Sequence, residues 1–177
     1  MNKIRNRLMI LLVGVLVIST GVASAAPPEQ RTMEKVRKEL VTLPYYGVFD
    51  NLEYKVEGST VTLFGQVRTP STRRDAERRV ARIEGIERVV NNIEVLPVSG
   101  FDDSIRARTY RAVFRSGSLY RYAMGANPSI HIVVKNGRVT LEGVVSNKMD
   151  SQLAYMAANG VPGVFSVTNN LRIASRS

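Results

Sequence analysis

The chain of 177 residues has no cysteine and a single histidine. Without cysteine there can be no disulfide framework and no thiol chemistry, so the fold must rest on a hydrophobic core. A lone histidine without a nearby carboxylate cluster is a poor metal site. No phosphate-binding glycine loop and no pair of carboxylates suited to acid–base chemistry occur. We therefore expect no enzyme activity, no catalytic residue, no metal and no cofactor.

The N-terminal segment has the layout of a secretory signal peptide. A basic stretch precedes an apolar run of eleven residues, and small residues at 23–26 offer a cleavage site after Ala25 or Ala26. The apolar run is short for a membrane span, which needs about 20 residues. We predict that residues 1–26 are a cleaved signal peptide and that the protein is periplasmic; an uncleaved anchor is the alternative.

The charge is unevenly distributed. Residues 31–98 hold 12 Lys or Arg against 10 Asp or Glu, whereas residues 100–177 hold 10 against 4. The second half therefore attracts anions more strongly. In an exported protein, anionic lipid or an envelope polymer fits this charge better than nucleic acid, which we do not expect as a partner.

An internal repeat organises the chain. A shift of 78 positions aligns residues 52–95 with residues 130–173 without a gap, and Gly65 falls on Gly143. The repeat predicts two tandem domains, at 31–98 and 101–174, that meet near a Pro- and Gly-containing boundary at 97–100.

Each copy has the pattern of an α-β-β-α-β module. Apolar spacing and capping residues predict four helices, at about 31–41, 70–84, 102–115 and 148–158, with Asp102 or Asp103 as the N-cap of the third. Asn136-Gly137 predicts a type I′ hairpin turn, and Gly58-Ser59 predicts type II′. Last strands are expected at 89–95 and 165–173. The predicted fold class is α+β, with two tandem modules that are each a small three-stranded mixed sheet with two helices packed on one face.

The hairpin register assigns the single histidine and the repeated glycine. A two-residue turn pairs His131 with Glu142 on the outer face, where we expect a solvent-side pair. The same register places Gly65 and Gly143 on the core face, opposite Leu52 and Ile130. We interpret both glycines as packing residues, each allowing a helix backbone to approach or a bulge to form.

Two basic surfaces are candidates for function. Arginines on the helix at 70–84 are diluted by acidic residues, and a solvated face is expected. The helix at 102–115 and the segment after it combine basic and aromatic residues, a pattern suited to a membrane interface. The alternative is that the aromatic rings only cover the end of a small core. The candidate lipid-binding residues are Arg108, Arg111, Arg115, Tyr120, Arg121 and Tyr122.

Both copies resemble the BON (bacterial OsmY and nodulation) domain family. The resemblance rests on "VKNGRVTLEGVV" at 134–145 with its counterpart at 56–67, each followed by a helix, a Gly and a V-x-x-V-x-N-x-L-like strand. It covers about residues 35–174. It implies a tandem-BON periplasmic protein without catalytic residues, often linked to stress, in which the second module contacts phospholipid.

The sequence therefore predicts an exported protein that maintains the envelope or protects against stress by contact with an anionic phospholipid membrane surface. The alternative is a soluble periplasmic chaperone or protein-interaction scaffold, with envelope proteins as partners. Attachment to envelope polysaccharide is a third interpretation.

Overall fold

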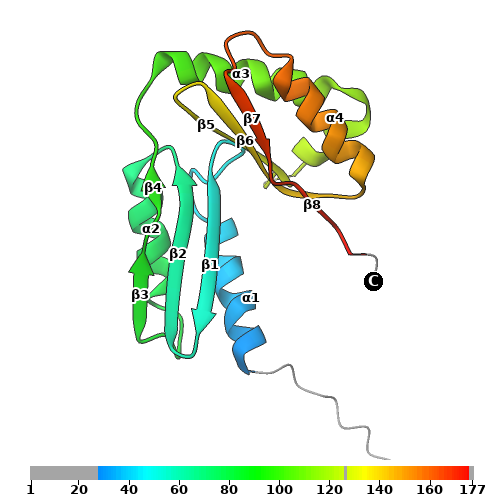
Figure 1. The fold of residues 1–177 in the computed structure, drawn as a ribbon. Helices are drawn as coiled ribbons and strands as arrows, with labels where there is room; N and C mark the ends of the chain where they lie inside the picture. The colour runs from blue at the N-terminus through cyan, green and yellow to red at the C-terminus, as the bar shows by residue number, and fades with distance from the viewer. Residues whose placement is uncertain (1–27, 126, 176–177) are drawn as a thin grey trace, which may run out of the picture.

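The computed structural model describes residues 28–125 and 127–175, so the predicted signal peptide lies outside the described residues. The chain folds into two α+β modules (Figure 1). The first module contains α1 (Pro28–Val41), β1 (Asn51–Glu57), β2 (Thr60–Val67), α2 (Pro70–Val80), β3 (Arg88–Asn91) and β4 (Glu94–Val95). The second contains α3 (Gly100–Arg115), the 3₁₀ helix η1 (Gly117–Ala123), β5 (Ile130–Lys135), β6 (Arg138–Val145), α4 (Lys148–Asn159), β7 (Ser166–Asn169) and β8 (Arg172–Ile173).

The sheets are mixed, as the sequence predicts. In each module the hairpin strands are antiparallel, and the last segment runs parallel to the second hairpin strand. The predicted last strand is split into two short ones in both copies. Asn91 Oδ1 accepts from the Ile93 amide, and Asn169 Oδ1 accepts from the Leu171 amide. The same two side chains donate to carbonyl oxygens of α2 and α4, so each Asn fastens a helix to the break.

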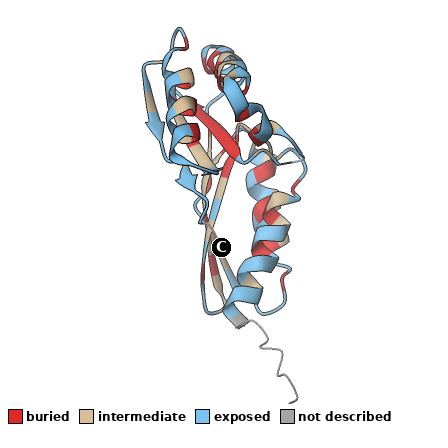
Figure 2. Ribbon diagram, turned by 90° about the vertical axis from the view of Figure 1, so that its right-hand side faces the viewer, coloured by how far each residue is buried: buried red, intermediate tan, exposed pale blue. Residues whose placement is uncertain are grey.

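Two cores stabilise the modules. One groups buried residues of α1, α2 and the first hairpin, and the other groups buried residues of α3, η1, α4 and the second hairpin. Both helices of a module pack against each other and against the same hairpin. In Figure 2, α1 has its buried residues on one side and exposed residues on the other. The predicted fold class is therefore confirmed.

The predicted hairpin turns and register are confirmed. Asn136 and Gly137 have φ values of 51° and 74°, as a type I′ turn requires. Gly58 has a φ of 60° while Ser59 is not in the positive region, which fits type II′. Gly143 pairs with Ile130, and His131 pairs with Glu142.

The two repeated glycines have a different neighbour from the one predicted. Gly65 and Gly143 have φ values of 108° and 114°. A Cβ on Gly143 would lie 2.1 Å from the Ser129 carbonyl oxygen, and a Cβ on Gly65 would lie 2.2 Å from that of Asn51. The close approach is thus made by the paired strand's backbone and not by a helix. The prediction of a helix contact was wrong because a pairing scheme does not show the positive φ that turns this position toward its own hairpin partner.

The N-cap of α3 also differs from the prediction. Ser99 is the cap, and its side chain accepts from the Asp102 amide. Asp102 is fully buried, and its two carboxylate oxygens accept from the Asn136 and Gly137 amides at 2.9 and 2.8 Å. An acidic residue in the first turn is favoured by the helix dipole, and here it also fastens the hairpin tip to the helix.

The loop between α1 and β1 joins the modules. Its first part, with Leu43 and Tyr46, packs on the first core, whereas Val48 and Phe49 pack on the second core. The Ile132 amide of β5 donates to the Val48 carbonyl at 2.7 Å. The first module therefore supplies part of the second module's packing.

His131 lies under this loop and not in solvent. Its side chain is buried, stacks on Tyr46 with ring centroids 5.4 Å apart, and has Nδ1 3.2 Å from the Gly47 carbonyl oxygen. The prediction of a solvent-side pair was wrong, because the pattern of one module cannot show that another module covers its outer face.

Candidate functional site

The exposed face of α3 carries a stripe of arginines. Arg111 and Arg115 are exposed, and Arg108 is half-buried with its Nε shielded from solvent and without a hydrogen-bond partner. Among the described residues none forms an ion pair with these three side chains. Ile105, Thr109 and Val113 on the opposite face are buried, so packing of that face turns the arginines outward.

The second module has no carboxylate left for these arginines. Its four acidic side chains all accept hydrogen bonds elsewhere. Asp102 holds the hairpin tip, Asp103 pairs with Arg106 and Arg68, Glu142 accepts from Asn170, and Asp150 accepts from the side chains around it. The positive charge of the stripe is therefore not neutralised within the described part of the chain.

Two of the predicted lipid contacts belong to a structural cluster. Tyr122 is only 7% exposed, and its hydroxyl donates to Asp150 Oδ2 at 2.5 Å while accepting from the Ser146 amide. Arg121 pairs with Asp150 and lies over the Tyr122 ring, with its Cζ 4.9 Å from the centroid. The hydrogen bond from Tyr122 lowers the pKa of Asp150, and the Arg121 charge adds to it. Tyr122 thus covers the end of the core, which was the alternative interpretation for the rings.

Tyr120 remains available at the surface. It is 60% exposed and lies on η1, the 3₁₀ helix into which the long connection after α3 folds. The structure therefore exposes Arg111, Arg115 and Tyr120 fully and Arg108 in part. It engages the buried Tyr122 and the exposed Arg121 in the Asp150 cluster.

An exposed aromatic pair was missed by the sequence reasoning. Phe101 and Phe165 are 48% and 72% exposed, and their ring centroids lie 5.8 Å apart. Phe101 begins α3 and Phe165 precedes β7, so only folding brings them together. Both rings lie next to Gly137, and Phe101 and the Arg108 guanidinium both lie next to Gly163. The sequence shows each phenylalanine near a glycine, but it does not show that the two rings meet in the folded chain.

The arginines of α2 are in a different electrostatic setting. Arg78 pairs with Asp75, Arg79 pairs with Glu39, and Arg73 donates to the Asn91 carbonyl. Arg74 on α2 and Arg82, in the turn that follows α2, are both exposed. No large exposed hydrophobic side chain lies on α2. The α2 surface is consequently a matched control for α3.

Residues 28–125 and 127–175 contain no group of three or more His, Asp or Glu placed to hold a metal ion. Within the same residues, no helix combines the length and apolarity needed to cross a bilayer.

Comparison with known proteins identifies both modules. The model of the BON domain matches residues 29–97 and 102–175. Two solved structures are similar at 10% sequence identity: the C-terminal domain of CdsD, a structural protein of the type III secretion system of Chlamydia trachomatis, and a second structure of CdsD. The first covers 81% of this chain and 97% of its own at a TM-score of 0.33, and the second covers 82% and 94% at 0.32. No curated protein matches the chain.

Proposed function

Because this chain belongs to the BON domain family, whose domains indicate a periplasmic or envelope protein, we propose that its second module contacts an anionic phospholipid surface. The family is non-enzymatic, and the proposal accordingly involves binding without chemistry. The observation that carries it is the arginine stripe of α3, which has no carboxylate partner among the described residues. The contact would serve envelope maintenance or stress protection.

The geometry supports a two-part contact. Arg111 and Arg115 attract lipid phosphates, each contributing about 1 kcal/mol near an anionic surface. Guanidinium groups suit this role because they bind phosphate through two donors at once. Phe101 and Phe165 supply the apolar component, since aromatic rings are favoured at the level of the headgroups. Tyr120 lies on the segment that follows the stripe, and its ring is available for the same layer.

The test is co-sedimentation of residues 27–177 with vesicles of phosphatidylglycerol or phosphatidylcholine, at low and high salt. We expect binding to the anionic vesicles only, and we expect it to weaken with salt because surface charge attraction is screened. The double variant Arg111→Glu/Arg115→Glu should lose most of this binding. Phe165→Ala should reduce the binding that remains at high salt.

The control is the double variant Arg74→Glu/Arg82→Glu, on α2 and the turn that follows it, which makes the same change in net charge. It should bind nearly as well as the unmodified chain if the surface on α3 makes the contact. Equal loss in both double variants would reduce the effect to net charge and contradict the proposal. Failure of the unmodified chain to bind either vesicle, together with salt-insensitive suppression of client aggregation, would favour the chaperone function instead.

The proposal includes export with cleavage after Ala25 or Ala26. N-terminal sequencing of the protein recovered from the periplasmic fraction should begin at Ala26 or Pro27. Recovery of an intact N-terminus in the membrane fraction would identify an uncleaved anchor.

A further inference from the structure

The outer edge of β1 is an unpaired strand edge beside a cleft between the modules. β1 is the first strand in its sheet order and pairs only with β2. Glu57 and Thr60 flank the two-residue turn, so this pair exchanges both of its hydrogen bonds. Pairing then alternates along the strand, which leaves the backbone groups of Leu52, Tyr54 and Val56 pointing away from β2.

The second module shows how such an edge is satisfied. The positions equivalent to Tyr54 and Val56 are Ile132 and Val134, which are 78 residues later. The Ile132 amide donates to the Val48 carbonyl at 2.7 Å, and the Val134 carbonyl accepts from Arg106 Nη2 at 2.6 Å. Two outward groups of β5 are thus satisfied within the chain, one by the turn that contains Val48 and one by an arginine.

The edge of β1 has no such cover within the described residues. Burial raises the pKa of Tyr46 to about 12, and the Leu52 backbone close to its hydroxyl opposes this shift. Beyond Leu52, no described residue donates to or accepts from the outward backbone groups of Tyr54 and Val56. Backbone donors and acceptors at strand spacing are complementary to another extended polypeptide, which adds to the sheet edge as a further strand.

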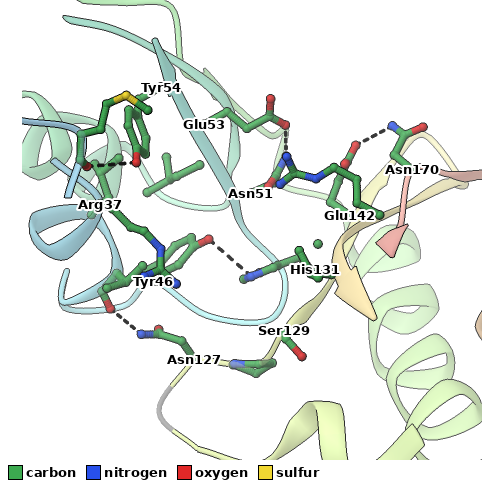
Figure 3. A pocket seen from close by; sticks show the side chains of 18 residues that line it. Arg37, Tyr46, Asn51, Glu53, Tyr54, Asn127, Ser129, His131, Glu142 and Asn170 are labelled. Atoms are coloured by element: carbon green, nitrogen blue, oxygen red, sulfur yellow. Dashed lines mark hydrogen bonds between the residues drawn. The ribbon is translucent and has the colours of Figure 1, made fainter. Parts of the chain in front are cut away.

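The cleft beside this edge has the lining of a peptide groove. It has a volume of about 840 Å³ and is bounded by α1, by β1 and by the start of β5 with the end of β6. Figure 3 shows Arg37 and Tyr54 on one side of it and His131 and Glu142 on the other. Met33, Leu40 and Leu52 supply apolar surface. A helix facing an edge strand is the arrangement in which strand addition places alternate side chains of the peptide into a groove.

The charges of the cleft indicate the chemistry of the occupant. Glu53 and Glu142 line it, and they accept from the side chains of Asn51 and Asn170 at 2.8 and 2.7 Å. Arg37 and Arg172 also line the cleft, and neither forms an ion pair with a described residue. Burial raises the pKa of Glu142, and the Asn170 hydrogen bond and the nearby Arg172 charge oppose this shift. The groups without a partner are therefore Arg37 and the strand edge.

We propose that the edge of β1 and this cleft bind an extended segment of a partner polypeptide that carries apolar side chains and a carboxylate. The segment pairs with the outward groups of Tyr54 and Val56, and its carboxylate lies against Arg37. Within the chain, the hydrogen bond from the Ile132 amide to the Val48 carbonyl satisfies one outward group of the equivalent edge. This inference uses an edge of the first module and a cleft between the modules, and it involves no residue of α3, so it is independent of the lipid contact.

The test uses a phage-displayed library of random peptides, selected on residues 27–177 and on the bare support. Peptides enriched on the protein should contain Asp or Glu and alternating apolar residues. Addition of an enriched peptide should slow amide exchange of Tyr54 and Val56 by about tenfold or more, because those amides gain a hydrogen bond. Amides of β3, the opposite edge of the same sheet, should be unaffected.

Two variants and one modified peptide make the test specific. Arg37→Glu should weaken binding by about tenfold, whereas Arg82→Glu in the turn after α2 should not. Alternate amides of a paired peptide face β1, and the others face away from it. N-methylation of the set that faces β1 should abolish binding, whereas N-methylation of the other set should not. Tyr54→Pro removes an outward amide that β2 does not use and should also abolish binding.

Several outcomes would overturn the proposal. They are the absence of enrichment above the bare support, protection that falls outside β1, and binding insensitive to both Arg37→Glu and peptide N-methylation. If Tyr54 and Val56 become protected as protein concentration rises without peptide, the occupant is a second copy of this chain and not a partner segment. Because neither the peptide N-methylation nor Arg37→Glu alters the core, the test remains decisive even if Tyr54→Pro fails to fold.

Discussion

At the residue scale, the repeated glycine is fixed by backbone geometry. Gly143 combines a φ of 114° with a paired carbonyl oxygen 2.1 Å from the position of a Cβ. Either feature alone disfavours a side chain, and together they exclude one without a backbone shift. The same pair of features at Gly65 explains why the glycine occurs at the same place in both copies.

Substitution of this glycine should be costly even for the smallest side chain. We expect Gly143→Ala to lower the free energy of unfolding by about 1–3 kcal/mol, from the positive φ and the clash with the Ser129 carbonyl. Gly160→Ala is the control, because there the nearest atom lies 3.5 Å from the Cβ position and φ is −78°. Urea unfolding measures both variants. Equal stabilities of the two variants would contradict the account.

His131 makes stability depend on pH. Burial lowers the pKa of His131 from its usual 6.5, with the Gly47 carbonyl and Asp50 opposing the shift. Below pH 6.5 the unfolded chain therefore binds a proton that the folded chain resists, so this contribution to stability is present above pH 6.5 and is lost as pH falls toward the folded pKa. Burial raises the pKa of Asp50 and of Glu142, which act in the opposite direction at lower pH.

The measurement is urea unfolding at pH 7.5 and pH 6.0, a range that lies above the ordinary titration of both carboxylates. The unmodified chain should be less stable at pH 6.0. His131→Gln should reduce this difference, although it also loses ring packing on Tyr46 at both pH values. An unchanged pH difference in His131→Gln would show that another group causes it.

At the element scale, local rules predicted most of the structure. The four helices, both hairpin turns and the pairing register follow from apolar spacing and from Asn136-Gly137 and Gly58-Ser59, because these signals act within a few residues. The end of α2 did not follow, since the helix stops at Val80 and not at the predicted residue 84. The breaks in the last strands did not follow, since Asn91 and Asn169 create them by reaching a helix carbonyl 18 residues away. The role of Asp102 was missed for the same reason, because its carboxylate accepts from the amides of turn residues that lie 34 and 35 positions later.

The candidate functional residues also differ in whether local sequence predicts their exposure. Exposure of Arg111 and Arg115 follows from the helical spacing of α3 and needed no tertiary information. The burial of Tyr122 and the pairing of Phe101 with Phe165 depend on which elements meet, and a basic-aromatic pattern gives no indication of either. A sequence pattern can thus place a charge on a face, but it cannot distinguish a ring that covers a core from a ring that faces solvent.

At the scale of the whole molecule, the repeat describes two equal modules, while the structure makes the second depend on the first. Val48 and Phe49 come from the first module and pack on the second core. Phe49 lies 6.1 Å from the Tyr110 ring, and Tyr110 lies 4.8 Å from Phe114. Alignment of the two copies cannot reveal this contact, because the loop at 43–50 lies before the aligned region.

The dependence can be measured with one substitution. We expect Phe49→Ala to lower the stability of the second module by about 1–3 kcal/mol, since a half-buried aromatic ring leaves its core. Amide exchange of Leu141, which is fully buried in β6, reports that stability. The control is Phe64→Ala, a half-buried ring on β2 outside both cores. Unchanged exchange of Leu141 in Phe49→Ala would mean that the modules are energetically independent.

Faster exchange of Leu141 in Phe49→Ala alone would show that the loop transmits stability between the modules. Because this loop ends at β1, a ligand held at the edge of β1 would then also stabilise the module that carries the arginine stripe.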